Sequence, residues 1–324
     1  MAAYRHLFSA FTIKSVTLRN RVVVPPLVQV RPITSPEGLG WYRRMARGGA
    51  GMVIVQATNN ELFGNELTPQ SLRPLVDTIH SEGAAAVVQL FPGPFGRDRQ
   101  VDDLSTADVE ALVAAFGVAA RVCRDAGFDG VEPHGAHSYL MHNFFKPDQN
   151  HRTDRYGGSA AGRARFAVES VRAMREAAGD ALLLLYRHTP TGAEYGLDES
   201  IDFARHLIDA GCDVLDISPA RDKSVADLAA PIRAACGAAV IAVGGMERPG
   251  DAESALTAGR CDLVAVGRQS IADAAWPEKV RQGRPDDVRR CIKCGKCSEM
   301  LTNRVPVCCV LWDEDEVAAH MAAP

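Results

Sequence analysis

The sequence contains no long hydrophobic run. None approaches the roughly 18 residues that a transmembrane helix needs, and the first twenty residues hold no continuous apolar stretch like that of a secretory signal peptide. Basic residues are not in excess either, because 36 Lys and Arg face 40 Asp and Glu, for a formal net charge of -4. Nucleic acid and an anionic membrane surface are therefore not indicated as partners. We expect a cytoplasmic protein whose partner is a small molecule or another protein.

The remaining composition is that of a globular protein. With 324 residues, 47% hydrophobic and 23% charged, the chain can form one α/β domain of roughly 250 residues plus an extension. It contains no low-complexity segment and no linker long enough to separate domains, which argues against disorder.

Short apolar runs alternate with longer helical patterns along most of the chain. Each run is apolar on both faces and ends at a turn signal, as expected of buried parallel strands. The predicted strands are 22–26, 52–57, 85–90, 128–132, 182–187, 214–218, 239–243 and 263–266, and predicted helices include 107–126, 160–178, 200–210 and 248–258. This pattern predicts an α/β fold, a (β/α)8 TIM barrel at residues 1–285, with a short C-terminal cysteine-rich extension at 286–324. An open doubly wound sheet is the alternative, disfavoured because no GxGxxG motif follows the first strand.

The segment 127–158 joins a predicted strand to three side chains that can handle protons. His134, His137 and Tyr139 follow the apolar run at 128–132, where a barrel places its catalytic groups. We predict that they form the catalytic centre. The alternatives are a purely structural role and a zinc site at His134 and His137, although no suitable third ligand lies nearby in sequence.

Other strand ends should face the same mouth of the barrel. Gln89 ends the third strand and Arg187 the fifth, while Pro26 and Leu27 end the first. A buried Arg and Gln need polar partners, which a planar hydrogen-bonding cofactor would supply. The last two strands end in VGGM and VGRQ, where Gly244, Gly245, Gly267 and Arg268 indicate a phosphate site.

Several ordered motifs make a family resemblance specific. They are GFDGVEPHGAHSYL, NHRTDRYGGS, NRVVVPPL, VVQL, LLYRHT and AVGRQSIADAAWPEKV. From about Leu7 to Lys279 the chain resembles the old yellow enzyme family, FMN-dependent oxidoreductases built on a (β/α)8 barrel. It is most similar to the barrel domain of 2,4-dienoyl-CoA reductases and trimethylamine dehydrogenases.

The resemblance assigns roles to the residues noted above. It implies flavin-ring contacts for Pro26, Leu27, Ala57, Gln89 and Arg187, and FMN phosphate contacts for Gly244, Gly245, Gly267 and Arg268. It implies that His134 and His137 donate hydrogen bonds to a substrate oxygen and that Tyr139 supplies a proton.

Five of the nine cysteines lie in the stretch CIKCGKCSEMLTNRVPVCC. In a cytosolic protein such clustering favours a metal over disulfides. Cys291, Cys294 and Cys297 follow a C-x2-C-x2-C spacing that suits either an iron–sulfur cluster or zinc. The resemblance implies a 4Fe-4S cluster, with Cys309 closer than Cys308 to the expected position of the fourth ligand. Zinc and a metal-free segment are the alternatives.

The chain also departs from the family. Val28 stands where many relatives have Thr or Cys beside the flavin, Pro92 replaces the His of the usual QLxHxGR motif, and the following segment 98–105 is short. These changes leave the substrate open. Because the sequence ends soon after the cysteines, we expect electrons from a separate partner.

The resemblance implies reduction of an activated C=C bond, with hydride from FMN and electrons arriving through the cluster from a ferredoxin, a flavoprotein or an NAD(P)H-oxidising subunit. Oxidation of an amine C–N bond and a non-catalytic electron-relay role are the alternatives, and a homo-oligomer is left open. The roles of His142, His151 and His188 are left open; His188 could face the barrel mouth but is read as a loop residue. Asp154, Arg155 and Tyr156 are read as fixing the loop after the fourth strand through local ion pairs.

Overall fold

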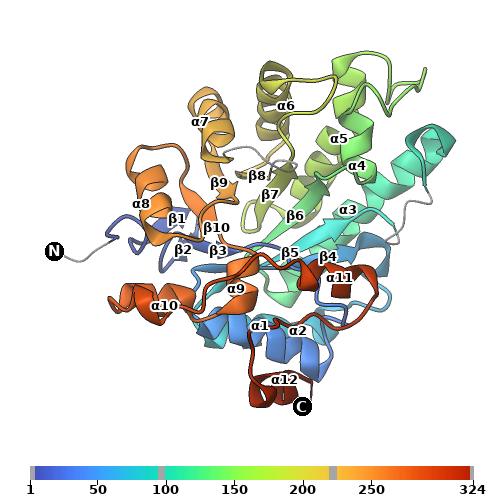
Figure 1. Cartoon of the computed structure of the whole chain (residues 1–324). Coiled ribbons are helices and arrows are strands. Elements are labelled where there is room, and N and C mark those ends of the chain that lie inside the picture. The colour runs from blue at the N-terminus through green and yellow to red at the C-terminus, as the bar shows by residue number, and fades with distance from the viewer. Residues whose placement is uncertain (1–3, 94–98, 219–224, 322–324) are drawn as a thin grey trace.

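Eight parallel strands form a closed barrel in the computed structural model, which describes residues 4–93, 99–218 and 225–321 (Figure 1). Around the barrel the order is β10-β3-β4-β5-β6-β7-β8-β9. The strands are β3 (Val22–Val24), β4 (Met52–Asn59), β5 (Ala85–Phe91), β6 (Gly130–Gly135), β7 (Leu183–His188), β8 (Val214–Ile217), β9 (Ala239–Val243) and β10 (Leu263–Ala265). The predicted (β/α)8 TIM barrel is confirmed.

Helices surround the barrel and connect successive strands. They are α1 (Pro36–Arg47), α2 (Pro69–Ser81), α3 (Thr106–Ala126), α5 (Ala160–Ala178), α6 (Leu197–Asp209), α7 (Val225–Cys236), α8 (Pro249–Thr257) and α10 (Trp276–Arg281), with short α4 (Leu140–Phe145) and α9 (Arg268–Ala272) after β6 and β10. The sequence sets their ends directly. Ser105 and Asp108 form a capping box at the start of α3, and Gly127, with φ of 93°, ends it in the left-handed conformation.

Side chains inside the barrel form a separate apolar core at its amino-terminal end. Val87, Leu185, Val214 and Ile241 belong to it, together with Ile13 and Leu18. The last two come from an antiparallel hairpin, β1 (Phe11–Ile13) and β2 (Val16–Leu18), which the sequence analysis did not predict. The hairpin covers the bottom of the barrel, opposite the pockets described below.

Above this apolar core, toward the carboxyl ends of the strands, the inward-facing side chains are polar on one side of the barrel. Because side chains alternate along a strand, the residues two positions beyond Val87, Leu185 and Val214 also face inward. These are Gln89, Arg187 and Asp216, and Glu132 is paired with Gln89 in the sheet register. All four are buried. Strands β5 to β8 therefore present polar groups at the carboxyl end of the barrel.

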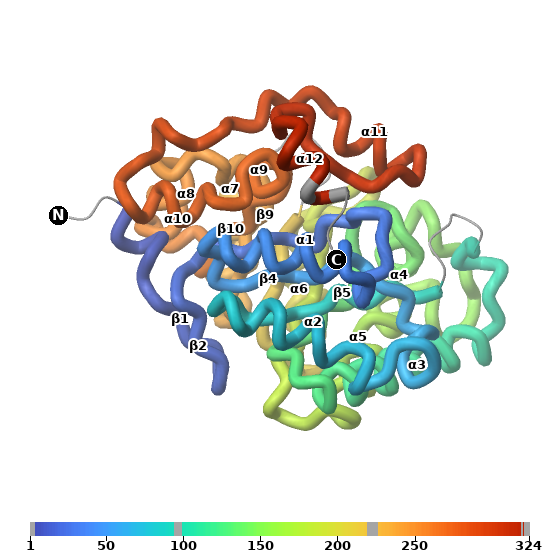
Figure 2. Tube along the Cα trace, turned by 90° about the horizontal axis from the view of Figure 1, so that it is seen from below, coloured from blue at the N-terminus to red at the C-terminus, as the bar shows by residue number. Residues whose placement is uncertain are grey.

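The C-terminal extension crosses the carboxyl end of the barrel and then descends beside α1 (Figures 1 and 2). It contains η3 (Pro285–Asp287), α11 (Lys296–Thr302) and α12 (Glu314–Met321). Gln269 of α9 fixes its start, since its side chain donates to the Arg289 carbonyl and accepts from the Cys291 amide, both at 2.9 Å. Further along, the Trp312 indole donates to the Ile271 carbonyl at 2.9 Å.

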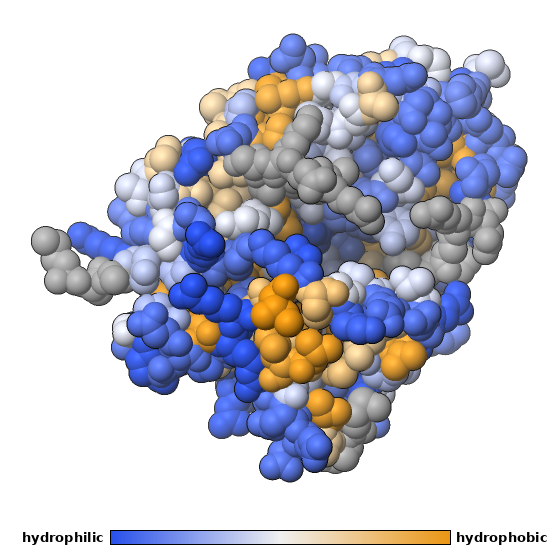
Figure 3. All heavy atoms as spheres, viewed as in Figure 1, coloured by the Kyte–Doolittle hydropathy of each residue, from blue (hydrophilic) through white to orange (hydrophobic). Residues whose placement is uncertain are grey.

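The surface of the extension differs from that of the barrel. Among the described residues, the exposed large apolar side chains are Tyr139 and four in the extension: Ile292, Leu301, Val305 and Val310. Figure 3 shows an apolar patch at the front of the molecule, below the hollow of the barrel mouth. The extension is therefore poorly packed compared with the barrel. No helix among the described residues has the length and apolar character to span a bilayer.

The predicted element boundaries hold to within two residues except at α6, which starts three residues earlier than predicted, and at β6. Helix α5 and strand β9 have the predicted bounds. Strand β6 starts two residues later than predicted and continues to Gly135. His134 therefore lies within the strand and not in the loop after it, which gives its ring a fixed backbone.

Candidate active site

Two adjoining pockets occupy the carboxyl end of the barrel, with volumes of about 250 and 290 Å³. Leu27, Arg187 and Arg268 line both of them. Their combined size suits an organic cofactor with a substrate, since small-molecule sites usually enclose about 300–1,000 Å³. We call them the ring pocket and the phosphate pocket.

The ring pocket brings together the residues expected to contact a flavin ring and the three expected catalytic groups. Its lining includes Pro26, Leu27, Ala57, Gln89, Arg187, His134, His137 and Tyr139. Two buried polar atoms here, Arg187 Nε and His134 Nδ1, have no hydrogen-bond partner among the described residues. Buried donors and acceptors are costly when unpaired, so a polar ligand fits this pocket better than an apolar one. A flavin ring, with its row of hydrogen-bonding edge atoms, meets that requirement.

The phosphate pocket contains all four residues predicted to bind phosphate. Gly244, Gly245, Gly267 and Arg268 line it. Gly245 has φ of 73°, a conformation that L side chains rarely adopt, and a Cβ there would point into open space. The backbone can thus approach an anion closely, with the Arg268 guanidinium beside it, and a phosphate fits.

The His134 ring lies between the other two expected catalytic rings and contacts both. The ring centroid of His134 is 5.3 Å from that of His137 and 5.1 Å from that of Tyr139. Phe91, at the end of β5, packs edge-on against Tyr139 at 5.2 Å. Tyr139 is 37% exposed and stands at the rim, whereas His134 is buried.

Both histidines are neutral at physiological pH. Burial lowers the pKa of His134 well below its usual value, and the nearby His137 and Arg187 lower it further. Burial, followed by the charge of Arg187, lowers the pKa of His137 to about 3. Each imidazole therefore carries a single N–H, and its direction depends on the partner of the other nitrogen.

Ser218 holds the His137 ring in place. Its hydroxyl oxygen accepts from Arg187 Nη2 at 3.0 Å and lies 2.9 Å from His137 Nε2. Because Ser218 is itself bonded to Arg187, the His137 ring has a fixed orientation at the wall of the ring pocket.

The structure gives hydrogen-bond partners to the three histidines whose roles the sequence left open, His142, His151 and His188. His142 accepts from the Ser138 amide at 2.8 Å and contacts the Tyr195 hydroxyl at 2.7 Å, while His151 is paired with Asp102 at 2.9 Å. His188 was predicted to be a loop residue, and this is wrong. It is the last residue of β7, is fully buried, and contacts the Ser200 hydroxyl at 2.9 Å, because its strand runs one residue further than predicted.

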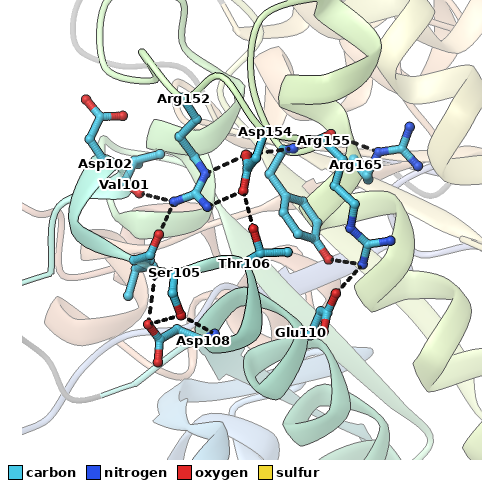
Figure 4. A network of polar contacts seen from close by, with 12 residues as sticks. Val101, Asp102, Ser105, Thr106, Asp108, Glu110, Arg152, Asp154, Arg155 and Arg165 are labelled. Carbon is cyan, nitrogen blue, oxygen red and sulfur yellow. Dashed lines mark hydrogen bonds and ion pairs between the residues drawn. The ribbon is translucent and has the colours of Figure 1, made fainter.

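The loop after α4 is held to α3 by the ion pairs that the sequence analysis expected (Figure 4). Asp154 accepts from Arg152 at 3.0 Å and from the Thr106 hydroxyl at 2.6 Å. The Arg152 hydrogen bonds hold the pKa of Asp154 below its usual value. Arg155 donates to Glu110 at 3.0 Å and to the Tyr156 hydroxyl at 2.7 Å. None of these residues lines the ring pocket or the phosphate pocket, so they support the loop and not the chemistry.

The five clustered cysteines surround one small pocket beside the other two. Cys291, Cys294, Cys297, Cys308 and Cys309 all line it. Cys308 Sγ lies 3.8 Å from the sulfur of Met300, whereas the surroundings of the Cys309 thiol include Cys291, Cys294 and Cys297. Within residues 4–93, 99–218 and 225–321, no three His, Cys, Asp or Glu side chains converge as ligands of a single metal ion.

Some lining residues were not anticipated from the sequence. The extension contributes Ser298, Leu301 and Val307 to the wall of the ring pocket. It also contributes Lys293 to the phosphate pocket, and the Lys293 ammonium pairs with Glu247 at 2.8 Å. The signal that could have indicated them is the position of the cysteines immediately after the last barrel helix. Val28 lines the ring pocket, Pro92 lies outside its lining, and part of the segment 98–105 lies outside the described residues.

Known proteins share both the fold and the sequence pattern. The chain matches the model of the NADH:flavin oxidoreductase / NADH oxidase family over residues 6–104 and 97–287. An NADH oxidase from Thermoanaerobacter brockii is 30% identical over 347 residues, which covers 91% of this chain and 53% of that protein. The chain spans about half the length of this relative.

Solved structures give the same result. A 2-naphthoyl-CoA reductase in complex with 2-naphthoyl-CoA has a TM-score of 0.86 at 24% identity, covering 95% of this chain and 57% of that one. A histamine dehydrogenase from Rhizobium sp. 4-9 has a TM-score of 0.83 at 25% identity, covering 95% and 52%. The resemblance to the old yellow enzyme family is confirmed, and the chain belongs to the NADH:flavin oxidoreductase / NADH oxidase family of FMN-dependent enzymes.

Proposed function

We propose that this flavin oxidoreductase reduces an activated C=C bond. The observation that carries the proposal is the grouping of His134, His137 and Tyr139 over a pocket that also exposes Gln89 and Arg187. The similarity to a protein named as a 2-naphthoyl-CoA reductase supports a reductive direction.

The chain's own residues would hold FMN in the two pockets. Pro26, Leu27, Ala57, Gln89 and Arg187 would contact its ring, and Gly244, Gly245, Gly267 and Arg268 its phosphate. When bound there, FMN supplies a hydride for the β-carbon of the alkene. Arg187 places a permanent positive charge in the pocket, which favours the reduced, more negative form of the cofactor.

His134 and His137 would act as oxyanion donors. A carbonyl conjugated to the alkene gains negative charge as the β-carbon accepts hydride, and two neutral imidazole N–H groups stabilise this charge. Because Ser218 holds the His137 ring and is itself bonded to Arg187, this donor is oriented before substrate binds.

Tyr139 would complete the addition by giving its phenolic proton to the α-carbon. A phenol hydroxyl can act as a general acid when it lies beside the reacting carbon. One hydride and one proton are added, the C=C bond becomes a single bond, and two electrons must be restored by an external donor.

We further propose that the extension binds a 4Fe-4S cluster through Cys291, Cys294, Cys297 and Cys309. A cubane holds four irons, so its thiolates stand further apart than the ligands of one zinc ion, whose Zn–S distances are about 2.3 Å. Five cysteines around one pocket without a single-ion site suit the larger group better. The contact of Cys308 with Met300 favours Cys309 as the fourth ligand.

The electron donor is proposed to be a separate partner: a ferredoxin, a flavoprotein or an NAD(P)H-oxidising subunit. Cys297 lines the ring pocket and Cys291 the phosphate pocket, so a cluster in the extension would lie beside bound FMN. The exposed Cys294 is on the outer side of the same segment. This arrangement suits a donor that approaches over the extension.

Amine oxidation is the second candidate function, because the histamine dehydrogenase structure is similar over 95% of this chain. Anaerobic turnover distinguishes the two. We expect enones to be converted to saturated products by FMN-loaded protein supplied with dithionite. Bleaching of the oxidised flavin by amines, with no saturated product from any enone, would contradict the proposed reduction.

A further inference from the structure

Two buried carboxyl groups lie beneath the ring pocket and take no part in the proposed chemistry. Glu132 and Asp216 each have no solvent-exposed surface. They come from β6 and β8 and flank Arg187 of β7. Carboxylates are rarely buried to this degree without several compensating partners, so their presence here requires an explanation.

Their contacts link four polar side chains, in the order Gln89, Glu132, Asp216 and Arg187, across four neighbouring strands. Gln89 Nε2 donates to Glu132 Oε1 at 2.7 Å, the Glu132 and Asp216 carboxyl groups lie at hydrogen-bonding distance, and Asp216 Oδ2 is 3.6 Å from Arg187 Nη1. Gln89 and Arg187, the two polar side chains expected to touch the flavin ring, thus stand at the two ends of this row of contacts.

The hydrogen bonds around Glu132 and Asp216 require that one of the two carboxyl groups carries a proton. Apart from their mutual contact, Glu132 Oε2 and both Asp216 oxygens have no hydrogen-bond donor among the described residues. Two ionised carboxylates at that distance repel each other, whereas one proton turns the contact into a hydrogen bond.

Charge balance leads to the same result. With both acids ionised, they and Arg187 would leave one net negative charge buried at the top of the barrel, which is strongly unfavourable. The neighbouring groups offer no compensation, because His134 is neutral and burial raises the pKa of the Cys212 thiol. With one proton shared between the two acids, Glu132, Asp216 and Arg187 together carry no net charge.

We propose that Glu132 and Asp216 are positioning residues that share one proton, with Glu132 as the protonated member and Asp216 as the anion paired with Arg187. In this state the Glu132 hydroxyl donates to Asp216 while Oε1 accepts from Gln89. Gln89 is thereby oriented with its amide oxygen toward the ring pocket, and the charge of Arg187 is balanced from behind. The pair sets the charge and the hydrogen-bonding pattern that the flavin ring meets. This inference rests on the proposed function for its FMN site.

The location of the proton follows from the neighbours of each acid. Burial raises the pKa of Asp216, but the Arg187 guanidinium lowers it again and so favours ionisation of Asp216 over that of Glu132. Glu132 faces a neutral amide and the Asp216 charge, and burial followed by that charge raises its pKa well above the usual value.

The test compares Glu132→Gln with Asp216→Asn by measuring the FMN midpoint potential. A glutamine reproduces a protonated glutamate, because its amide can donate to Asp216 and accept from Gln89, so E132Q should keep the wild-type potential. D216N leaves Arg187 unbalanced. It should favour reduced over oxidised FMN at least tenfold, a rise of about 30 mV for a two-electron couple. Asp213→Asn, a paired carboxylate at the other end of the barrel, is the control and should change nothing.

An equal rise in the potential of E132Q and D216N would overturn the proposal, because it would mean that Glu132 is ionised in the native protein. A second readout does not depend on FMN. The infrared spectrum of the wild-type apoprotein should show a protonated carboxylic acid band that E132Q lacks, and its absence would also overturn the proposal. Failure of FMN to bind would instead reject the proposed function while leaving the infrared test intact.

Discussion

Tyr139 stands at the rim of the ring pocket, packed on one side against Phe91 and His134. Replacing it with Phe removes the proton donor but keeps the ring. We expect Tyr139→Phe to lower enone reduction by about 10²–10⁴-fold, the usual contribution of a general acid, without loss of FMN. Anaerobic steady-state kinetics with a flavin absorbance ratio measure both effects. Tyr156→Phe, which removes a hydroxyl outside the pocket, is the control, and equal losses in the two variants would contradict the assignment.

Buried neutral histidines make the stability of the protein depend on pH. Burial lowers the pKa of His188 to about 3, whereas an exposed histidine in the unfolded chain titrates near 6.5. Between these values the unfolded state binds more protons, so stability is complete above about pH 6.5 and is lost as the pH falls toward 3.

We expect wild-type protein to lose roughly 2 kcal/mol of unfolding free energy from His188 alone between pH 7 and 5. His188→Gln should reduce this loss. Urea unfolding at the two pH values measures it. An unchanged pH dependence in the variant would show that His188 is not the source.

At the scale of single residues, the sequence indicated candidate catalytic side chains better than it indicated which charged residues are buried inside the barrel. His134, His137 and Tyr139 were visible because three such side chains follow one apolar run. Glu132 and Asp216 were not, although each is a charged residue inside a buried strand. Whether such a residue faces the barrel interior or the helices depends on strand register, and that is set by pairing with strands distant in the sequence.

At the element scale, the turn after β9 provides a specific test of the phosphate pocket. Gly245 has φ of 73° and open space where a Cβ would stand. We expect Gly245→Ala to weaken FMN binding at least tenfold, because a methyl group prevents close backbone approach to the phosphate. The left-handed conformation should also cost about 1–2 kcal/mol of stability. Isothermal titration with FMN and thermal unfolding measure the two effects.

Gly237 offers a matched control, since it has φ of 68°, equally open surroundings and a position outside both pockets. Gly237→Ala should lose similar stability while binding FMN normally. If both variants bind FMN equally well, Gly245 does not contact the phosphate.

The extension should depend on its cysteines for order. It buries few large apolar side chains, among them Val307 and Trp312, so packing alone gives it little stability. We expect Cys294→Ser to abolish iron binding and to raise hydrogen exchange at least tenfold across residues 289–311, with the barrel strands unchanged. Cys309→Ser should behave likewise and Cys308→Ser should not. Normal exchange in all three variants would contradict a structural cluster.

Local patterns predicted the barrel elements well because buried strands and capped helices have strong sequence signals. The bounds of α5 match the prediction, and Ser159 caps its start. The β1–β2 hairpin was missed because its strands have three residues each, too few for a visible alternation. The contribution of Leu301 and Val307 to the ring pocket could not be predicted, since it depends on how the extension folds back over the barrel.

At the scale of the whole molecule, the cysteine pocket, the phosphate pocket and the ring pocket adjoin one another at the mouth of the barrel. The cysteine pocket shares Arg268 with both of the others, and Cys291 and Cys297 each line two pockets. The proposed sites for electron entry, cofactor and substrate would therefore lie together at one end of the barrel. The amino-terminal end of the barrel is covered by the hairpin and filled by apolar side chains.

The most direct test of the central claim is a rapid-mixing measurement of flavin oxidation. Protein loaded with FMN is reduced anaerobically, freed of excess reductant and mixed with a conjugated enone, and the flavin absorbance is followed in wild type and Tyr139→Phe. We predict fast recovery of the oxidised flavin spectrum in the wild type, with one equivalent of saturated product per flavin, and slow recovery in the variant. A flavin that stays reduced in the presence of every enone would contradict the account.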